Sequence, residues 1–282
     1  TYSKCCTMWP FQSKRTECTT VRSCPVCGKS RARIIGQLKK TFLLNLSKGE
    51  WDFVQCKHCE LLYISPEPSA TDLRTIYVES GQFDDPAYTD PARVALIIEY
   101  MDGCFRGVVE RSRHRANDAV AVLEVGAGLA WMCRAAKAVN PDNVTVALDV
   151  SPEAVHQCPW VDFYILGDIL DARMDERAPY DVISLTHVIE HLVDPVEVIR
   201  RCKSLLRQHG VIFVTAPHRP IGWRDSETEI AVWEKYSYNH VPAHIQYFSK
   251  KSMRKLAEKA GCTLDHWSHN SEEGQAFEAW LR

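Results

Sequence analysis

The chain has 282 residues, of which 45 % are hydrophobic and 25 % are charged, a size and composition that exclude a disulfide-stapled mini-protein and a disordered or fibrous chain. This length allows one large domain, or an ordinary domain with a smaller appendage. The 34 Lys and Arg residues nearly balance the 36 Asp and Glu residues, for a net charge of −2, so no global basic field draws the chain to nucleic acid or to anionic lipid.

The sequence carries no sign of a membrane segment. A membrane-spanning helix needs roughly 18 to 20 consecutive apolar residues, and no stretch of this chain approaches that length. Residues 1–10 also lack the apolar core of a signal peptide. We therefore expect a cytoplasmic protein without a membrane span.

In chain order, the first predicted element is a cysteine-rich module over residues 1–66. Seven of the 12 cysteines fall within the first 59 residues, and four of them form two C-x-x-C pairs, Cys24 with Cys27 and Cys56 with Cys59. Each such turn aims two thiolates at one point, and two turns complete the tetrahedron of sulfur ligands that Zn²⁺ prefers in structural sites. The pattern predicts structural zinc.

Apolar runs around the second pair predict the strands of a zinc ribbon. Residues 34–37 and 51–54 lie between the two pairs, and a third short strand over 61–64 ends at Pro66. So short a module buries too little apolar surface to fold alone, and bound zinc would supply the missing folding energy.

Two other interpretations of the C-x-x-C pairs remain open. They could form two disulfides, which the expected cytoplasmic location disfavours, or a redox centre, which lacks the surrounding βαβ pattern. Cys5, Cys6 and Cys18 have no regular spacing, and we assign them no role. The remaining five cysteines stand singly in segments that read as core elements, and we expect them to be buried: Cys104, Cys133, Cys158, Cys202 and Cys262.

A linker or lid is expected over residues 67–91, with a short helix near 70–78, before a larger domain over residues 92–282. That domain begins with an amphipathic helix over 92–114. Continuous apolar runs then alternate with helical stretches, which predicts a doubly wound, mostly parallel α/β sheet. The predicted strands lie at 119–123, 144–148, 161–166, 182–185 and 211–214, with helices near 129–139, 152–158, 194–208 and 249–260. A closing antiparallel strand is expected over 277–281.

Ligands of such sheets bind at the carboxyl ends of the strands, where this chain places glycines and acids. Gly126 and Gly128 follow the first strand and would let the backbone approach a ligand closely. A dinucleotide fingerprint would need a third glycine at Trp131, which disfavours a nicotinamide or flavin dinucleotide. Asp149 ends the second strand and suits a ribose diol, while Asp168 after the third strand could accept from an adenine amino group.

These motifs, in this order, resemble the S-adenosylmethionine-dependent class I methyltransferases. The resemblance covers roughly residues 92–282 and implies a Rossmann-like, seven-stranded sheet. The N-terminal ribbon looks like that of a subgroup that methylates sugars, including deoxysugars of natural-product and surface-glycan pathways. One departure is Ala130, which replaces the last glycine of the family's first motif. The motifs are Glu124-x-Gly126-x-Gly128, Asp149-x-Ser151-Pro152, Gly167-Asp168, Tyr180 to Ile183, Val188 to Pro195 and Tyr247-Phe248-Ser249.

By this resemblance, S-adenosylmethionine is the cofactor, Asp149 holds its ribose hydroxyls, Asp168 binds the adenine amine and Ile169 packs on the adenine ring. The full set of implied cofactor contacts is Glu124, Gly126, Gly128, Asp149, Val150, Asp168, Ile169, Thr186 and His187. Because the sulfonium already carries an activated methyl group, the protein's task is to position the acceptor and remove its proton.

A histidine cluster follows the fourth strand and offers the base for that proton. His191 is our first choice, with His187, Glu190 and His244 as further catalytic candidates. An alternative is that Glu190 and His191 merely orient the chain by hydrogen bonding. The same four residues could also hold a catalytic divalent ion, similar to the metal site of small-RNA 2′-O-methyltransferases, although His187 stands where that site has a glutamate.

The acceptor is expected to meet the aromatic-rich loop over residues 217–242, unless this loop is only a packed cover. We predict methylation of a hydroxyl of a small molecule, a sugar or glycoside, with carbon methylation of a keto-sugar as a close variant. A second hypothesis is an RNA-directed enzyme whose ribbon binds nucleic acid, which the single basic cluster and the missing RNP-like aromatic pattern disfavour. A third is a scaffold that lost its chemistry. The oligomeric state is left open.

Overall fold

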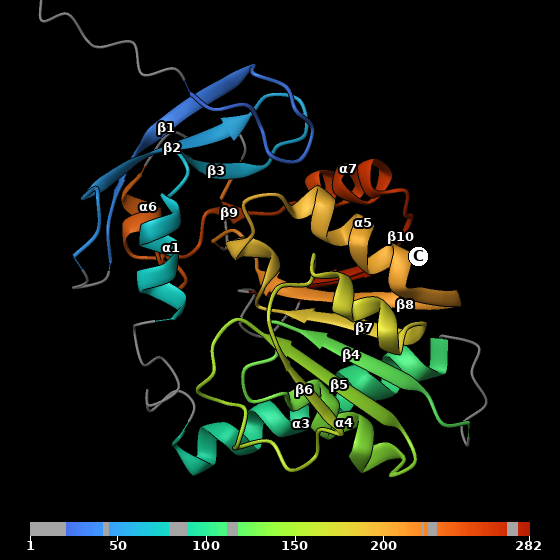
Figure 1. Cartoon of the computed structure of the whole chain (residues 1–282). Helices are drawn as coiled ribbons and strands as arrows, with labels where there is room; N and C mark the ends of the chain where they lie inside the picture. Colours follow the sequence, from blue (N-terminus) through green and yellow to red (C-terminus); the bar gives the residue numbers. More distant parts are fainter. Residues whose placement is uncertain are drawn as a thin grey trace, which may run out of the picture.

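Two β-sheets organise the chain in the computed structural model, which describes residues 21–41, 45–78, 89–111, 118–220, 223–224, 230–269 and 276–282. The larger sheet has seven strands in the order β10-β11-β8-β7-β4-β5-β6, and the smaller has four in the order β1-β2-β3-β9. Figure 1 shows the smaller sheet above the larger one, with helices between them. Cys5, Cys6 and Cys18 lie outside the described residues.

The seven-stranded sheet is parallel in five neighbouring strands and antiparallel at one edge. This confirms the predicted doubly wound, mostly parallel α/β fold and the closing antiparallel strand. The central strands are largely buried on both faces, as their mostly apolar sequences predict. The strands are β4 (Ala121–Val125), β5 (Val144–Asp149), β6 (Phe163–Leu166), β7 (Tyr180–Thr186), β8 (Leu206–Pro217), β10 (Leu264–His269) and β11 (Ala276–Leu281).

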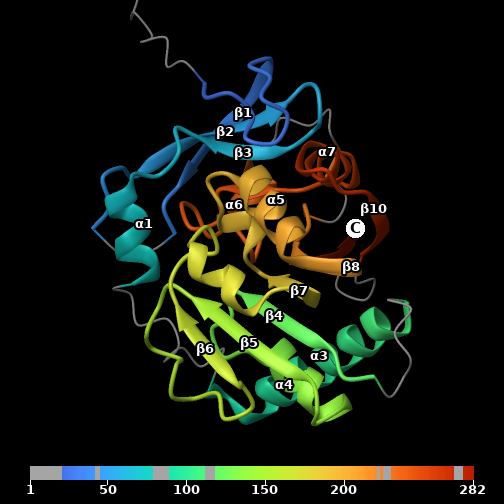
Figure 2. The ribbon, with the colours of Figure 1, turned by 45° about the vertical axis from the view of Figure 1, so that its right-hand side comes forward.

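Helices cover both faces of this sheet (Figures 1 and 2). Helices α3 (Pro91–Arg111) and α4 (Trp131–Val139) lie on one face, where Val122 and Val182 point. Helices α5 (Pro195–Leu205) and α7 (Lys250–Ala260) lie on the other, where Leu123 and Ile183 point. This alternation follows from the two-residue side-chain period of a strand. All five scattered cysteines are buried, as predicted.

The expected helix over residues 152–158 is wrong, because the chain forms only turns there. The Ser151 hydroxyl accepts from the Glu153 amide at 3.4 Å, but no helix follows. So short a segment forms too few helical hydrogen bonds to offset nucleation, and Pro159 disfavours helix at the residue before it. Strand β10 was missed, because its LDHWSH sequence lacks an apolar run.

The ribbon strands are β1 (Ala32–Lys39), β2 (Glu50–Cys56) and β3 (Leu62–Ser65), all antiparallel. The fourth strand of their sheet is β9 (Gln246–Tyr247), which comes from the far end of the chain and pairs with β3. Trp233 of α6 (Ala231–Glu234) packs on Phe53 with ring centroids 4.6 Å apart. The ribbon is thus built into the larger fold, and a domain boundary at residue 66 stays a prediction.

Helix α1 (Ala70–Tyr77) follows the ribbon strands and confirms the short helix predicted near residues 70–78. It begins with a capping box, in which Ser69 and Asp72 each accept from the other's backbone amide. Among the described residues, no helix is both long enough and apolar enough to pass through a lipid bilayer.

Candidate active site

Loops that follow the parallel strands are hydrogen-bonded to the ends of neighbouring strands along one edge of the large sheet. The amide of Ala127 donates to the carbonyl oxygen of Leu148 at 3.0 Å, and the amide of Gly167 donates to that of Asp149 at 2.9 Å. The amide of His187 donates to the carbonyl of Thr215 at 2.8 Å. These bonds fix the loops after β4, β6 and β7 to the carboxyl ends of β5 and β8, at the edge where parallel sheets bind ligands.

The turn after β4 depends on glycine at position 126. Gly126 has a φ of 60°, and a Cβ atom added there would lie 2.5 Å from Cγ2 of Val188 in the loop after β7. Gly128 also has a positive φ, of 48°. Ala130, where the family pattern has its third glycine, has a φ of 53°. The alanine therefore keeps the left-handed backbone that a glycine would adopt more easily.

Asp149 lies at the centre of this edge, buried, with its carboxylate turned towards the glycine turn. One oxygen accepts from the Gly128 amide at 2.7 Å and the other from the Ser151 amide at 2.8 Å. A carboxylate has about four acceptor positions, so two remain for further donors such as ribose hydroxyls.

The other candidate cofactor residues of β5 and β6 differ in exposure. Asp168 is exposed, and its carboxylate accepts from the Leu170 amide at 2.8 Å. Ile169 is buried in the main core, whereas Val150 is 48 % exposed beside Asp149. Val150 therefore offers the more accessible apolar surface, and an adenine contact by Ile169 stays a prediction.

Glu124 lies beneath the glycine turn rather than on the open edge. Its carboxylate is buried and accepts from the Cys133 amide at 2.9 Å, which ties β4 to the start of α4. Burial raises the pKa of Glu124 to about 7, although the hydrogen bond from the Cys133 amide acts against this shift. The side chain therefore supports the turn from below.

We expect Glu124→Gln to remove the pH dependence that the Glu124 carboxyl gives to the free energy of unfolding. A carboxyl whose pKa rises on folding, here from 4.5 to about 7, stabilises the fold fully below pH 4.5 and loses that effect as pH rises through 7. The parent should therefore lose about 3 kcal/mol of unfolding free energy relative to the variant between pH 4.5 and pH 8. Denaturant unfolding at several pH values measures this difference.

The matched control is Glu110→Gln, which changes an exposed glutamate of α3. Its unfolding free energy should stay within about 0.5 kcal/mol of the parent at every pH. If the unfolding free energies of the parent and Glu124→Gln differed by the same amount at pH 5 and at pH 8, the predicted titration would be contradicted.

The four predicted catalytic candidates meet at the end of β7. Thr186 ends the strand, His187 has a φ of 53°, and a single 3₁₀ turn over Ile189–His191 follows. The Glu190 side chain is fully buried, with its Oε1 atom 3.3 Å from Nδ1 of His187 and 3.8 Å from Nε2 of His191. Burial alone would raise the pKa of Glu190, but the neighbouring histidines outweigh it and lower the pKa to about 2.

His244 and Tyr77 complete this cluster. Nδ1 of His244 lies 2.8 Å from the carbonyl oxygen of Tyr238, and its ring centroid lies 4.8 Å from that of His191. Burial lowers the pKa of His244 to about 3. The Tyr77 hydroxyl, from α1, lies 2.7 Å from Nδ1 of His191. Sequence reasoning missed Tyr77, since nothing local marks a linker tyrosine as a partner of a histidine 114 positions later.

The aromatic loop over 217–242 divides between two roles. Trp233 is fully buried against the ribbon, and Trp223 packs on it with ring centroids 5.5 Å apart. Tyr238 instead stacks on His187, with centroids 6.1 Å apart and ring planes 15° apart. Part of the loop therefore packs against the ribbon, whereas Tyr238 presents its ring to His187, one of the catalytic candidates. Residues 221–222 and 225–229 lie outside the described chain.

The two C-x-x-C pairs meet at the base of the ribbon, where all four cysteines are buried. The Sγ atoms of Cys24 and Cys59 are 3.5 Å apart, as are those of Cys27 and Cys56, and all four lie within 4.8 Å of one another. A disulfide would need about 2.05 Å. Zn–S bonds of about 2.3 Å in a tetrahedron give S···S separations of about 3.8 Å. This donor set therefore fits zinc.

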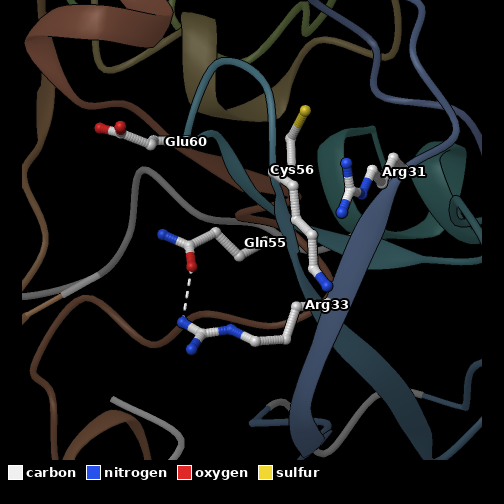
Figure 3. A pocket seen from close by; sticks show the side chains of 6 residues that line it. Arg31, Arg33, Gln55, Cys56 and Glu60 are labelled. Carbon is white, nitrogen blue, oxygen red and sulfur yellow. Dashed lines mark hydrogen bonds between the residues drawn. The ribbon is translucent and has the colours of Figure 1, made fainter. Parts of the chain in front are cut away.

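A basic pocket lies beside these cysteines and is formed by ribbon residues alone. Arg33 donates to the side-chain oxygen of Gln55 at 2.6 Å, as Figure 3 shows. Because three cations and one carboxylate line the pocket, a bound ligand would be anionic. The lining residues are Arg31, Arg33, Gln55, Cys56, Lys57 and Glu60.

Comparison with known proteins assigns this chain to a family. A family model described as "Methyltransferase domain" matches residues 97–266. Curated relatives include the ubiquinone biosynthesis O-methyltransferase of Vibrio parahaemolyticus, 26 % identical over 149 residues that cover 50 % of this chain and 57 % of that protein. That of Xylella fastidiosa is 31 % identical over 108 residues, which cover 36 % and 43 %. The chain thus spans about half the length of the curated relatives it matches.

Solved structures give more distant likenesses. Mitomycin 7-O-methyltransferase MmcR has a TM-score of 0.46 and 17 % identity, over 71 % of this chain and 60 % of that one. An O-methyltransferase family protein from Burkholderia thailandensis has a TM-score of 0.48 and 15 % identity, over 73 % and 63 %. The family match over residues 97–266 confirms the part of the resemblance that concerns the methyltransferase domain, and the chain belongs to the methyltransferase domain family.

Proposed function

We propose that this chain is an S-adenosylmethionine-dependent O-methyltransferase that acts on a small molecule, a sugar or glycoside. The observation that carries the proposal is the glycine turn after β4, which binds Asp149 through the Gly128 amide and packs at Gly126 against Val188, the residue between His187 and the turn of Glu190. The curated relatives are named as O-methyltransferases, which supports oxygen as the acceptor atom. The sugar acceptor is carried over from the resemblance of the ribbon.

In this proposal the strand-end residues bind and orient the cofactor. Gly126 and Gly128 let the methionine part lie against the backbone, and the free acceptor positions of Asp149 take the ribose hydroxyls. Asp168 receives the adenine amine, with Val150 and Ile169 as apolar neighbours. The bound cofactor supplies a methyl group on a positive sulfur, so its reaction needs alignment rather than activation.

The acceptor oxygen attacks the methyl carbon in line with the breaking C–S bond, and its proton passes to a base. The sequence favoured His191 as that base. However, Nδ1 of His191 is engaged by Tyr77 and Ala243, and its Nε2 faces Glu190. The His187 side chain is 40 % exposed, and its Nδ1 lies beside Glu190. Its Nε2 atom is therefore left to take the proton of the hydroxyl that is methylated. We therefore assign proton removal to His187 and positioning to His191.

The Cys24, Cys27, Cys56 and Cys59 thiolates are proposed to hold a structural zinc ion. Support comes from the S···S separations and from the turns, since Gly28 and Glu60 follow the two pairs with φ of 71° and 66°. The His58 amide also points at Sγ of Cys56, 3.4 Å away. Such amide contacts help to hold a thiolate at a metal.

Cofactor binding is tested by calorimetry with S-adenosylmethionine and S-adenosylhomocysteine. Hydrogen bonds to a charged group contribute about 1.5 to 3 kcal/mol each, so loss of the Asp149 carboxylate in Asp149→Ala should weaken binding at least about 100-fold. Asp149→Asn keeps one acceptor for the Gly128 amide and should show a smaller loss. Asp142→Ala, an exposed aspartate in the loop before β5, is the control.

Thermal melts of the same samples show whether each Asp149 variant is folded. Affinity that is unchanged in a folded Asp149→Ala or Asp149→Asn protein would contradict the proposed ribose contact. Absence of binding to the parent would contradict the proposed cofactor itself.

A second candidate function is methylation of RNA, and the basic pocket of the ribbon favours it (Figure 3). Phosphate contacts make affinity fall steeply with salt. If the ribbon binds RNA, affinity for a mixed RNA pool should fall about tenfold or more between 50 and 200 mM salt, and Arg31→Ala should weaken it.

A further inference from the structure

We propose that Glu190, His191 and His244 form a binding site for a divalent transition-metal ion, separate from the four cysteines. One oxygen or nitrogen atom from each of the three side chains lies within 4.8 Å of the other two. Glu190 and His244 are buried and His191 is half-buried, at the end of β7.

Both histidines are held so that a lone pair is left for a ligand. Nδ1 of His191 lies 3.0 Å from the carbonyl oxygen of Ala243, and Nδ1 of His244 lies 2.8 Å from that of Tyr238. A carbonyl only accepts, so each Nδ1 carries the ring proton and each Nε2 is an acceptor. Backbone carbonyls commonly orient metal-binding imidazoles in this way.

The Glu190 carboxylate is the third acceptor, and its nearest polar neighbour is Nδ1 of His187, 3.3 Å from Oε1. Neither of its oxygens accepts a hydrogen bond within the part of the chain that the structure describes, although the side chain is fully buried. Three acceptors that face one another in a buried place repel unless a cation lies between them. A fully buried carboxylate that accepts no well-formed hydrogen bond is thus the independent sign of an ion.

The two segments that carry these ligands are locked together. The Ile245 amide donates to the carbonyl of Glu190 at 2.9 Å, and the side-chain amide of Gln246 donates to that of Ile189 at 2.8 Å. The Tyr77 hydroxyl donates to the Ala243 carbonyl at 2.9 Å, which holds the partner of His191. The ligand set is therefore built into the fold rather than formed by loose side chains.

Two imidazoles and one carboxylate suit Zn²⁺, Fe²⁺, Co²⁺ or Mn²⁺, with further positions left for water or a ligand oxygen. An ion here would lie beside His187 and could take the hydroxyl of an acceptor, whose proton it would make easier to remove. This role rests on the proposed function. Binding of the ion does not, so the test uses neither cofactor nor acceptor.

The test is the metal content of the folded chain after loading with Zn²⁺ or Mn²⁺ and removal of free ion. Elemental analysis counts both metals, and electron paramagnetic resonance reports Mn²⁺, which the thiolate site disfavours. We expect two ions per parent chain, one in each site, and one ion in Glu190→Gln and His244→Gln. Removal of a ligand should weaken binding at the second site by at least about 100-fold.

Glu190→Gln is a fair test because it need not unfold the protein. Its amide can donate to the unprotonated Nε2 atoms, so the variant should melt no lower than the metal-free parent. His240→Gln is the matched control, since His240 lies beside His244, with ring centroids 4.9 Å apart, but outside the ligand set. A parent with one ion per chain, or equal second-site binding in a folded Glu190→Gln, would overturn the proposal.

Discussion

Cys56→Ser is expected to yield a chain that holds no ribbon zinc and melts far below the parent. A structural zinc site contributes about 10 to 16 kcal/mol in isolated zinc-finger peptides, comparable with the whole net stability of a domain, about 5 to 15 kcal/mol. Cys56 is fully buried among the other three thiols. Zinc content measured by elemental analysis, with a thermal melt of the same sample, checks both expectations.

The loss should spread beyond the ribbon because the ribbon is not separate. Strand β3 pairs with β9, and the Ile64 amide donates to the Ile245 carbonyl at 3.0 Å, next to His244. Cys104→Ser is the control, since Cys104 is also buried but lies on α3, outside the cluster. It should keep its zinc and melt within a few degrees of the parent. A Cys56→Ser chain that keeps the ribbon zinc, or melts with this control, would contradict the prediction.

The parts of this fold that follow from short-range pattern could be predicted from the sequence. The central strands β4 and β7 are mostly apolar, and the C-x-x-C spacing brings cysteines together within one turn. Strand β10 has polar side chains at four of its six positions, in adjacent pairs, and was missed. The helix expected over 152–158 had favourable starting residues but too little length to form.

The contacts that shape the candidate site come from distant parts of the chain and have no local signal. Strand β9 is two residues long and finds β3 only in the folded molecule. Tyr77 reaches His191 because the ribbon carries α1 to the sheet edge. Likewise, sequence alone could gather His191 and His244 as candidates but could not say which nitrogen of each ring is free. That depends on the carbonyls of Tyr238 and Ala243.

His187→Gln is expected to lower kcat for methyl transfer by about 10² to 10⁴, the usual contribution of a positioned base. The affinity for S-adenosylhomocysteine should change little, since the proposed cofactor contacts are mainly those of Asp149 and the glycine turn. Initial rates with S-adenosylmethionine measure kcat and KM separately, with an acceptor found by screening hydroxylated sugars and glycosides.

Two further variants separate a base from a positioning residue. His191→Gln loses the ring that Tyr77 and the Ala243 carbonyl hold, so we expect a smaller fall in kcat together with a rise in acceptor KM. His156→Gln, an exposed histidine outside the cluster, should match the parent. If His187→Gln kept the parent kcat while His191→Gln lost it, the base would be His191, and Nε2 of that ring would have to turn from Glu190 to the acceptor. The contacts of Nδ1 with the Ala243 carbonyl and the Tyr77 hydroxyl argue against such a rotation, because the turned ring would lose both.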